Sequence, residues 1–251
     1  MKQKPALLNG ICTWAATRFF QRIHRITHRM PLRIRPIERQ KVLVIAPHPD
    51  DEVIGAGGSL ALHQQAGSDV VVAFLTPESR ETGVPTSRIR QEEARRVGAS
   101  LGFRCRFLGY PDGQLSLHER EIAEDLADLL REFAPDAVIT PFVSDHHRDH
   151  QAAAHALSLA IGTSGFRGEV WCCELWSTLW PNVAIDIGNV ADHKRDTINL
   201  YESQVAGLPY AETALALNRY RGMRARLPYA ECFYVCSAQQ FIDLSKTLTS
   251  I

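Results

Sequence analysis

The chain of 251 residues has no net charge, because 28 basic and 28 acidic side chains cancel. It also lacks an apolar run of the roughly 20 residues that cross a membrane. An apolar stretch over residues 6–17 is interrupted by Asn9 and Thr13 and ends at Arg18, and it shows no secretory signature. No internal repeat or low-complexity tract is present. These absences predict a globular protein, as does the 45% content of hydrophobic residues.

The six cysteines lack the regular spacing of a zinc-binding knuckle. Cys172 and Cys173 are adjacent, Cys232 and Cys236 are separated by three residues, and both pairs fall in strand-like segments. A chain of this length builds a sizeable core without disulfides. We therefore expect reduced, mostly buried thiols in a cytoplasmic protein.

The neutral total conceals two segments of opposite charge. Residues 1–40 hold nine basic side chains and one acidic side chain, a balance of +8, so residues 41–251 carry −8. Composition thus predicts a basic N-terminal extension over residues 1–40 and one domain over residues 41–251.

The extension has the pattern of an amphipathic helix. Apolar residues recur at helical spacing, and four arginines from Arg18 to Arg29 form a basic stripe along it. Two interpretations stay open. The helix contacts an anionic membrane through residues 1–36, or it packs on the domain or on a partner subunit of a homo-oligomer. The second is the commoner use of an amphipathic helix. The first would place a cytoplasmic protein on the inner face of the membrane.

From residue 41 the pattern changes to short apolar runs separated by amphipathic helices. The run at 41–47 is apolar almost throughout, as in a strand buried on both faces of a parallel sheet. The alternation predicts an α/β fold, with a Rossmann-like, doubly wound and mostly parallel sheet and helices on both faces. The expected strands are 41–47, 70–75, 105–108, 137–140 and 169–175, and the expected helices are 57–65, 87–101, 117–133, 151–161 and 192–205.

Two clusters of acids and histidines follow strands of this sheet. Residues 47–52 read P-H-P-D-D-E after the first strand, and residues 144–150 read S-D-H-H-R-D-H after strand 137–140. Doubly wound sheets bind ligands at the carboxyl ends of the strands, where the strand order reverses. Either cluster alone is typical of a solvated turn. Together, at neighbouring strand ends, they supply the imidazoles and carboxylates of a mononuclear metal site.

We expect His48, Asp51 and His150 to be the ligands, which leaves one coordination position for water. Zinc suits this set and lowers the pKa of a bound water to about 7. Asp50, adjacent to a ligand, would accept the proton of that water during attack. His147 would face the reacting group as a cationic donor, and Asp149 would orient an imidazole.

These motifs resemble the (A/P)HPDDE and HxDH signatures of the PIG-L/LmbE-like deacetylases. The similarity continues through R-x-x-E at 90–93, L-G at 101–102 and an aspartate-glycine pair at 112–113. It reaches C-terminal elements with Lys194 and Glu231 and covers about residues 41–235. The resemblance implies a zinc-dependent enzyme that removes the acetyl group from an N-acetylglucosaminyl substrate, with the ligands and base given above. It also implies that His147 stabilises the tetrahedral intermediate or protonates the leaving amine, and that Asp149 orients His147.

The resemblance further implies that Arg90 and Asp112 contact the sugar. Where many members of the family have a T-x-G-E turn, this chain reads T-P-E-S over residues 76–79, and Glu78 is the candidate that reaches a sugar hydroxyl. The expected partner is an N-acetylated amino sugar or glycoconjugate, and no nucleic acid is expected to bind.

Two other classes of function stay open. Two histidines and a carboxylate also form the ligand set of non-haem iron oxygenases, which makes Fe²⁺ the alternative metal. The other class is a noncatalytic sugar-binding scaffold, although Asp50 beside a full ligand set favours catalysis. A dinucleotide site is not expected, because residues 55–58 read G-A-G-G and depart from G-x-G-x-x-G. Trp171, Trp176 and Trp180 are more typical of a core or an interface than of a sugar platform.

Overall fold

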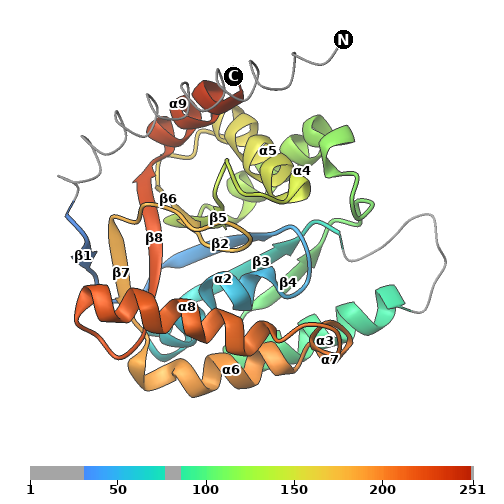
Figure 1. Cartoon of the computed structure of the whole chain (residues 1–251). Helices are drawn as coiled ribbons and strands as arrows, with labels where there is room; N and C mark the ends of the chain where they lie inside the picture. Colours follow the sequence, from blue (N-terminus) through green and yellow to red (C-terminus); the bar gives the residue numbers. More distant parts are fainter. Residues whose placement is uncertain (1–30, 77–85, 250–251) are drawn as a thin grey trace, which may run out of the picture. The chain divides into compact units, whose positions relative to one another are not determined.

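Figure 1 shows the computed structural model of the chain, which describes residues 31–76 and 86–249. One eight-stranded sheet has the order β1-β7-β8-β6-β5-β2-β3-β4. Neighbouring strands are parallel except around β8, which runs antiparallel to β6 and β7. The predicted α/β fold with a mostly parallel sheet is confirmed. The strands are β1 (Arg33–Ile34), β2 (Lys41–Ala46), β3 (Asp69–Phe74), β4 (Arg104–Phe107), β5 (Ala137–Pro141), β6 (Glu169–Cys173), β7 (Val183–Asp186) and β8 (Ala230–Ser237).

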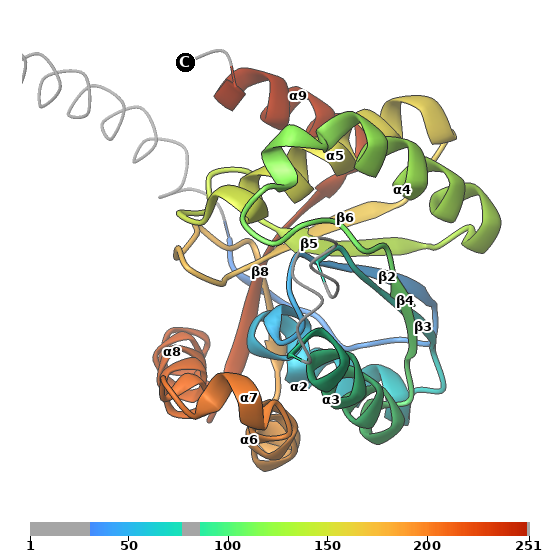
Figure 2. The same cartoon turned by 90° about the vertical axis from the view of Figure 1, so that its right-hand side faces the viewer.

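Helices cover both faces of the sheet, as predicted (Figure 2). One layer contains α4 (Glu119–Phe133), α5 (Arg148–Ser164) and α9 (Ala238–Thr249). The other layer contains α2 (Asp51–Gln65), α3 (Thr86–Leu101), α6 (Ala191–Asn199), α7 (Glu202–Val205) and α8 (Tyr210–Ala225). Two short 3₁₀ helices, η1 (Leu115–Leu117) and η2 (Gly188–Val190), lie in the connections.

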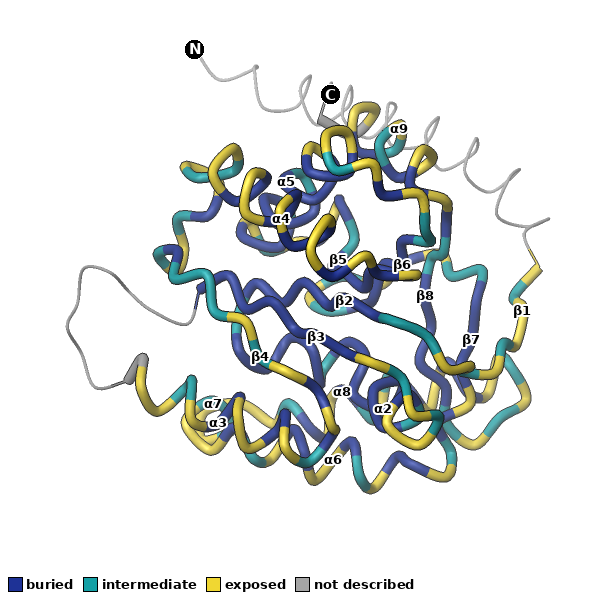
Figure 3. Tube along the Cα trace, turned by 180° about the vertical axis from the view of Figure 1, so that it is seen from behind, coloured by how far each residue is buried: buried dark blue, intermediate teal, exposed yellow. Residues whose placement is uncertain are grey.

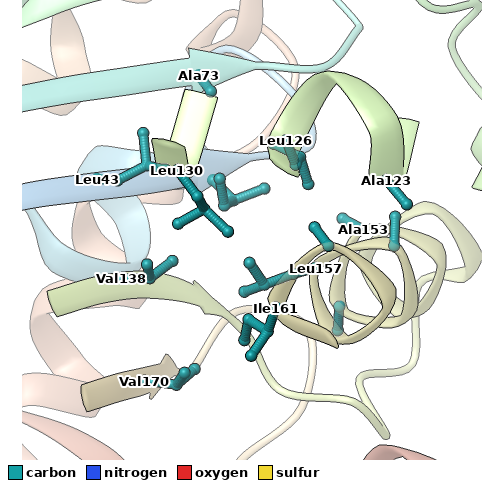
Figure 4. Close-up of a cluster of buried hydrophobic side chains, with 14 of the residues drawn as sticks. Leu43, Ala73, Ala123, Leu126, Leu130, Val138, Ala153, Leu157, Ile161 and Val170 are labelled. Atoms are coloured by element: carbon teal, nitrogen blue, oxygen red, sulfur yellow. The ribbon is translucent and has the colours of Figure 1, made fainter. Parts of the chain in front are cut away.

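Two apolar cores form because alternate side chains of a strand point to opposite faces of the sheet. In β2, Leu43 belongs to the core under α4 and α5, whereas its neighbour Val42 belongs to the core under α2. Figure 4 shows Leu43 with Leu130 of α4 and Leu157 of α5 in the first core. Figure 3 shows β2 and β5 mostly buried and the edge strand β4 partly exposed.

The strand order reverses at β2. This strand pairs with β3 on one side and with β5 on the other, and all three are parallel. The loops after β2 and after β5 therefore leave the same edge of the sheet, at the position where doubly wound folds bind ligands. This brings the two polar clusters, far apart in sequence, next to each other.

Some elements differ from the expected ones. Helix α2 begins at Asp51 instead of near residue 57 and is kinked at Ala56, where φ is −142° and ψ is 15°. The helix expected over 192–205 is divided into α6 and α7 around Tyr201, which is fully buried and donates a hydrogen bond to Glu52. The break is needed to direct this tyrosine into the core. Strands β1, β7 and β8 and helices α8 and α9 are additional to the elements expected from periodicity.

The sheet includes residues that composition groups with the basic extension. Strand β1 pairs with β7, and the Arg35 guanidinium lies 3.1 Å from the Glu169 carboxylate and 4.8 Å from the Trp171 ring centroid. The compact unit that contains the sheet begins at Arg33. Residues 1–30, with the basic stripe and Cys12, lie outside the described residues.

Five cysteines occur in the described ranges, all as free thiols, and four of them are buried. Burial raises the pKa of the Cys105 thiol to about 11 and that of Cys232 to about 12, so both stay protonated at neutral pH. Across residues 31–76 and 86–249, no helix combines the length and the apolar character that a membrane span requires.

Candidate metal and catalytic centre

The first half of the candidate site is the turn between β2 and α2. The Thr76 hydroxyl donates a hydrogen bond of 2.6 Å to the Pro47 carbonyl, which ties this turn to the end of β3. Asp50 adopts φ 121° and ψ −28°, a backbone conformation that is rare for a residue with a side chain. Contacts with the surrounding structure must stabilise such a strained conformation. Here the Asp50 N–H donates to the Glu52 carboxylate at 3.1 Å.

The second half of the site is the segment from Asp145 into α5. One carboxylate oxygen of Asp145 accepts the His147 N–H at 2.9 Å and lies 3.1 Å from His150 Nδ1. The other oxygen accepts the N–H groups of Trp176 and Ser177, both at 3.2 Å. Asp145 therefore orients the His150 ring and joins the loop after β5 to the loop after β6. Its position in a polar loop did not distinguish it in the sequence.

The side chains predicted as metal ligands lie together. Asp51 Oδ2 is 3.1 Å from His48 Nδ1 and 3.3 Å from His150 Nε2. Asp51 is 5% exposed and His150 is fully buried. Within the described part of the chain, His150 Nε2 has no hydrogen-bond partner, although buried polar atoms ordinarily have one. A buried nitrogen without a hydrogen bond, beside a carboxylate and a second imidazole, fits a transition metal.

Other donor atoms surround this group. His48, His147 and His150 offer ring nitrogens that lie within 4.8 Å of one another, and His48, Asp112 and Asp149 form a second such group. The His147 and His150 ring centroids are 4.7 Å apart. His48 is common to both groups, so it is the central donor of the site.

Asp149 orients His48. Its Oδ2 lies 3.2 Å from His48 Nε2 and accepts the Gly113 N–H at 2.7 Å, while Oδ1 accepts the Leu115 N–H at 3.2 Å. Its backbone N–H donates to His147 Nδ1 at 3.2 Å. The Asp149 side chain, expected to orient His147, therefore contacts His48 instead. This arrangement also holds the aspartate-glycine loop against the site.

The electrostatics of the site also fit a cation. Burial opposes protonation of His48, but hydrogen bonds to three carboxylates, first that of Asp112, raise its pKa well above the ordinary value. Burial likewise opposes protonation of His150, yet Asp51 and Asp145 raise its pKa to about 9. Without a metal, protonated imidazoles offset the carboxylates. A divalent cation would supply the same compensation.

Asp50 lies next to this group without being part of it. It is 8% exposed, and no described residue donates a hydrogen bond to its carboxylate. Burial raises the pKa of Asp50 well above its usual range, and the neighbouring charges of Asp51 and Glu52 add to the effect. A carboxyl group in which the two protonation states are closer in energy near neutral pH suits proton transfer.

His147 is partly exposed at the mouth of the site. Burial, together with the charges of His150 and His48, lowers the pKa of His147. This favours the neutral ring over the cationic donor expected from sequence. Because Nδ1 accepts the Asp149 N–H, the ring proton of the neutral form is on Nε2.

The residues implied in sugar binding are only partly described. Arg90 Nη1 lies 3.5 Å from Asp112 Oδ2, and the Asp112 side chain is 48% exposed. Asp112 Oδ1 is also 3.2 Å from His48 Nε2, so this pair reaches from the surface to the metal centre. Glu78 falls in residues 77–85, outside the described residues.

A buried ion pair supports the first turns of α2. Lys194 is fully buried, and its ammonium lies 2.7 Å from Glu231. The Glu231 carboxylate accepts the N–H groups of Gly58 at 2.8 Å and Ser59 at 2.7 Å. A Cβ at Gly58 would lie 2.7 Å from the Ile187 side chain, which explains glycine at this close approach. The G-A-G-G segment thus allows tight helix packing beneath the metal turn.

Similarity to known proteins agrees with this architecture. Residues 43–161 match the PIG-L family model, described as GlcNAc-PI de-N-acetylase. The diacetylchitobiose deacetylase of Thermococcus kodakarensis is 29% identical over 191 residues, which cover 66% of this chain and 70% of that protein. The probable N-acetyl-alpha-D-glucosaminyl L-malate deacetylase 2 of Bacillus cereus is 27% identical over 201 residues, which cover 66% and 84%.

Among solved structures, the conserved protein TT1542 from Thermus thermophilus matches with a TM-score of 0.68 and 30% identity. The match covers 77% of this chain and 93% of that one. The fold and the site define an α/β protein with histidines and carboxylates gathered where the strand order reverses. The chain belongs to the PIG-L family of LmbE-like deacetylases.

Proposed function

We propose that the protein is a metal-dependent hydrolase that removes the acetyl group from an N-acetylated amino sugar. The observation that carries this proposal is the contact of Asp51 with both His48 and His150, beside the buried Asp50. The Thermococcus and Bacillus relatives, both named as deacetylases, support the same class of reaction.

His48, Asp51 and His150 would hold the metal, and we assign zinc because histidines and one carboxylate with an open position are typical of catalytic zinc. Zinc supplies a Lewis acid for the amide carbonyl and lowers the pKa of a coordinated water to about 7. Asp145 and Asp149 position the two imidazoles from behind, at 3.1 Å and 3.2 Å. Such carboxylates fix the ring orientation and increase the basicity of the ligand.

Asp50 serves as base and then as acid. It accepts one proton from water as the water oxygen bonds to the carbonyl carbon, and it returns that proton to nitrogen as the C–N bond breaks. The products are acetate and the free amine of the sugar. The raised pKa of Asp50, caused first by burial, suits a group that must both accept and release a proton.

His147 donates a hydrogen bond from Nε2–H to the oxygen that gains negative charge during attack. The Asp149 N–H on Nδ1 leaves this Nε2 proton available. A donor that is already oriented stabilises the developing charge without rearranging. His147 can therefore perform this role in its neutral form, with a single ring proton on Nε2.

Arg90 and Asp112 are proposed to hold the sugar, together with Glu78. Arg90 and Asp112 form an ion pair, and the exposed half of the Asp112 side chain is available to hydroxyl groups. The exposed position of this pair beside His48 supports a sugar that enters from the side of α3 and β4.

We propose a cytoplasmic location, which the free cysteines support. For residues 1–36 the prediction of contact with an anionic membrane stands beside packing on this domain or on a partner subunit. Cosedimentation with anionic vesicles separates the two. The membrane role predicts that the full chain sediments and a chain without residues 1–30, which keeps β1, does not, whereas equal behaviour of both chains contradicts it.

The test of the reaction is Asp50→Asn in the zinc-loaded full chain. We expect kcat for amine release from an N-acetylglucosaminyl substrate to fall by about 10²–10⁴-fold, because the base is lost. Metal content, measured by elemental analysis, stays at the wild-type value. Asp128→Asn, on an exposed side chain of α4, is the matched control. Unchanged amine release by a metal-bearing Asp50→Asn variant would refute the mechanism.

The same assay separates zinc from iron and catalysis from simple binding. Full turnover under anaerobic conditions with zinc as the sole metal supports hydrolysis, since an iron oxygenase requires O₂. Turnover that requires both ferrous iron and O₂ would establish the alternative enzyme class. Sugar binding without amine release under either condition would establish the noncatalytic scaffold.

A further inference from the structure

A cavity of about 220 Å³ lies beside the metal centre. Asp51 and Gly55, at the start of α2, line one side of it, and Tyr210, Ala214 and Leu217 of α8 line another. A water molecule in the liquid occupies roughly 30 Å³, so the cavity is several times larger than the methyl group of an acetyl requires. The methyl group of an acetamide would fill only a small part of this volume.

The chemistry of the cavity wall selects a neutral apolar ligand. Apart from Asp51, the one charged residue in the described lining is Glu174, and it forms a buried ion pair with Arg221. The Arg221 Nε–H donates to Glu174 at 2.9 Å. The remaining lining residues are apolar or uncharged, so a charged group would lose its hydration there without a partner of opposite charge. A hydrocarbon group fits this wall.

Exposed apolar side chains continue the wall outward. Trp176 is 54% exposed and Leu208 is 49% exposed, and both line the cavity. Trp176 packs edge-on against Tyr210, with ring centroids 6.4 Å apart. Trp171 is a core residue, as expected, but Trp176 and Trp180 are exposed and do not belong to the core. An exposed apolar group at the mouth of a cavity is typical of a ligand-binding surface.

The cavity and the sugar-binding pair reach the metal centre through different residues. Arg90 and Asp112 reach it through His48, next to α3 and β4. The cavity reaches it through Asp51, between α2 and α8. An amide carbonyl at the centre has two substituents, the sugar nitrogen and the acyl carbon. If the Arg90–Asp112 pair holds the sugar, the apolar cavity remains for the acyl carbon.

We propose that this cavity also binds the hydrocarbon chain of an N-acyl group longer than acetyl, so that amino sugars with butanoyl to hexanoyl chains are substrates beside the N-acetylated ones and have a lower KM. The inference rests on the proposed amide hydrolysis. It alters only the acyl product: water still adds to the carbonyl carbon, the C–N bond still breaks, and a short-chain carboxylate leaves instead of acetate.

The first test compares N-acetyl-, N-butanoyl- and N-hexanoylglucosamine as substrates of the zinc-loaded full chain. Each methylene that leaves water improves binding by roughly fourfold, so KM is expected to fall about fifteenfold from acetyl to butanoyl, which adds two methylenes. A KM that rises with chain length would overturn the inference while leaving deacetylation in place. Absence of turnover on all three would instead count against the proposed hydrolysis. Binding of these ligands to the metal-free protein would then show whether the cavity holds the hydrocarbon chain.

Two filling variants test the location. Ala214→Phe projects a ring from the cavity wall, and Thr213→Phe does so from an exposed lining position that tolerates a larger side chain. Both are expected to remove the preference for hexanoyl over acetyl, measured as the ratio of kcat/KM values. Ala216→Phe, exposed on the same helix and outside the cavity lining, keeps the wild-type ratio. An unchanged ratio in a folded Thr213→Phe variant would overturn the location.

The second test does not depend on metal or turnover. N-hexanoylglucosamine should alter tryptophan fluorescence of the metal-free protein with a Kd at least tenfold below that of N-acetylglucosamine, and Trp176→Phe should remove most of the signal. Equal Kd values for the two ligands would overturn the inference. Hexyl N-acetylglucosaminide, with the hydrocarbon on the other end of the sugar, is the control. If it binds more tightly and Thr213→Phe abolishes that gain, the cavity holds the aglycone and the acyl assignment is wrong.

Discussion

The two faces of the sheet are stabilised by different chemistry. Under α4, α5 and α9 the buried core consists of aliphatic and aromatic side chains such as Leu126 and Leu157. The face under α2, α6 and α8 has a comparable apolar core but also buries Lys194, Glu231 and His63. An apolar core tolerates many arrangements of similar volume, whereas a buried charge requires one particular partner. The apolar face therefore contributes stability, and the ionic face also fixes the position of α2 through specific contacts with Glu231.

The site depends on that difference. Asp51 is the first residue of α2, and Glu231 holds the N–H groups of Gly58 and Ser59 in the same helix. Glu52, beside Asp51, accepts hydrogen bonds from the Asp50 N–H and from the Tyr201 hydroxyl. Burial raises the pKa of Glu52 to about 7. The polar contacts behind this turn thus hold the strained Asp50 and the proposed ligand Asp51 together.

Removing the cation from the ionic face should have the largest effect. Lys194→Met leaves Glu231 buried without its counter-charge, so we expect the free energy of unfolding to fall by about 3–5 kcal/mol in urea denaturation. Metal affinity, measured by competition with a chelator, should weaken by roughly tenfold because α2 is less well held. Adding Glu231→Gln, which removes the unpaired charge and keeps an acceptor, should recover part of the stability. If Lys194→Met lowers the free energy of unfolding by less than about 1 kcal/mol, the Lys194–Glu231 ion pair is not an important stabilising feature of the face under α2, α6 and α8.

Truncation on the apolar face should affect stability without affecting the site. Leu126 is fully buried, so Leu126→Ala is expected to lower the free energy of unfolding by about 3 kcal/mol through lost burial and a cavity. Metal affinity should remain at the wild-type value. Leu117→Ala, on a side chain that is 73% exposed, is the control and should change stability by less than about 0.5 kcal/mol. A variant Leu126→Ala that loses metal affinity as Lys194→Met does would contradict the division between the faces.

The smallest expected effect is a pH dependence that arises from His63. This ring is 2% exposed, and burial lowers its pKa to about 4. Below pH 6.5 the unfolded chain binds a proton that the folded protein resists, so this contribution destabilises the fold as the pH falls from 6.5 toward 4. Between pH 7 and pH 5 the loss is about 2 kcal/mol. His63→Gln should lack it, whereas His146→Gln, on an exposed ring, should retain it. Urea denaturation of each variant at pH 7 and at pH 5 measures this loss of unfolding free energy. If His63→Gln loses as much as the wild type, the assignment of the pH dependence to His63 is wrong.

Much of the fold and site could be predicted from sequence because the relevant signals are local. Apolar runs and amphipathic periodicity located β2, β3, β5 and most of α3 and α4 within a few residues. The P-H-P-D-D-E and H-x-D-H clusters each follow a strand, and parallel strands bring their carboxyl ends to one edge. For this reason His48, Asp51 and His150 could be proposed together before any contact was known.

Other features depend on residues that meet only in three dimensions. Asp145 resembles any acid of a polar loop until its contacts with His150 and Trp176 are seen. The Asp149 side chain contacts His48 and the aspartate-glycine loop. No rule of sequence spacing distinguishes these contacts from the expected contact with the His147 ring. The cavity requires α8, a helix absent from the expected elements, to lie against the start of α2.

The sequence by itself determined the turns, the strand periodicity and which residues are candidate metal donors, because these depend on neighbouring residues and on the general geometry of parallel sheets. Tertiary structure decided which charge each buried group faces, which imidazole each carboxylate orients and where apolar volume remains beside Asp51. The physical reason is that Coulomb interactions, hydrogen bonds and packing act over a few ångströms in space, and the fold brings into contact groups that are far apart along the chain.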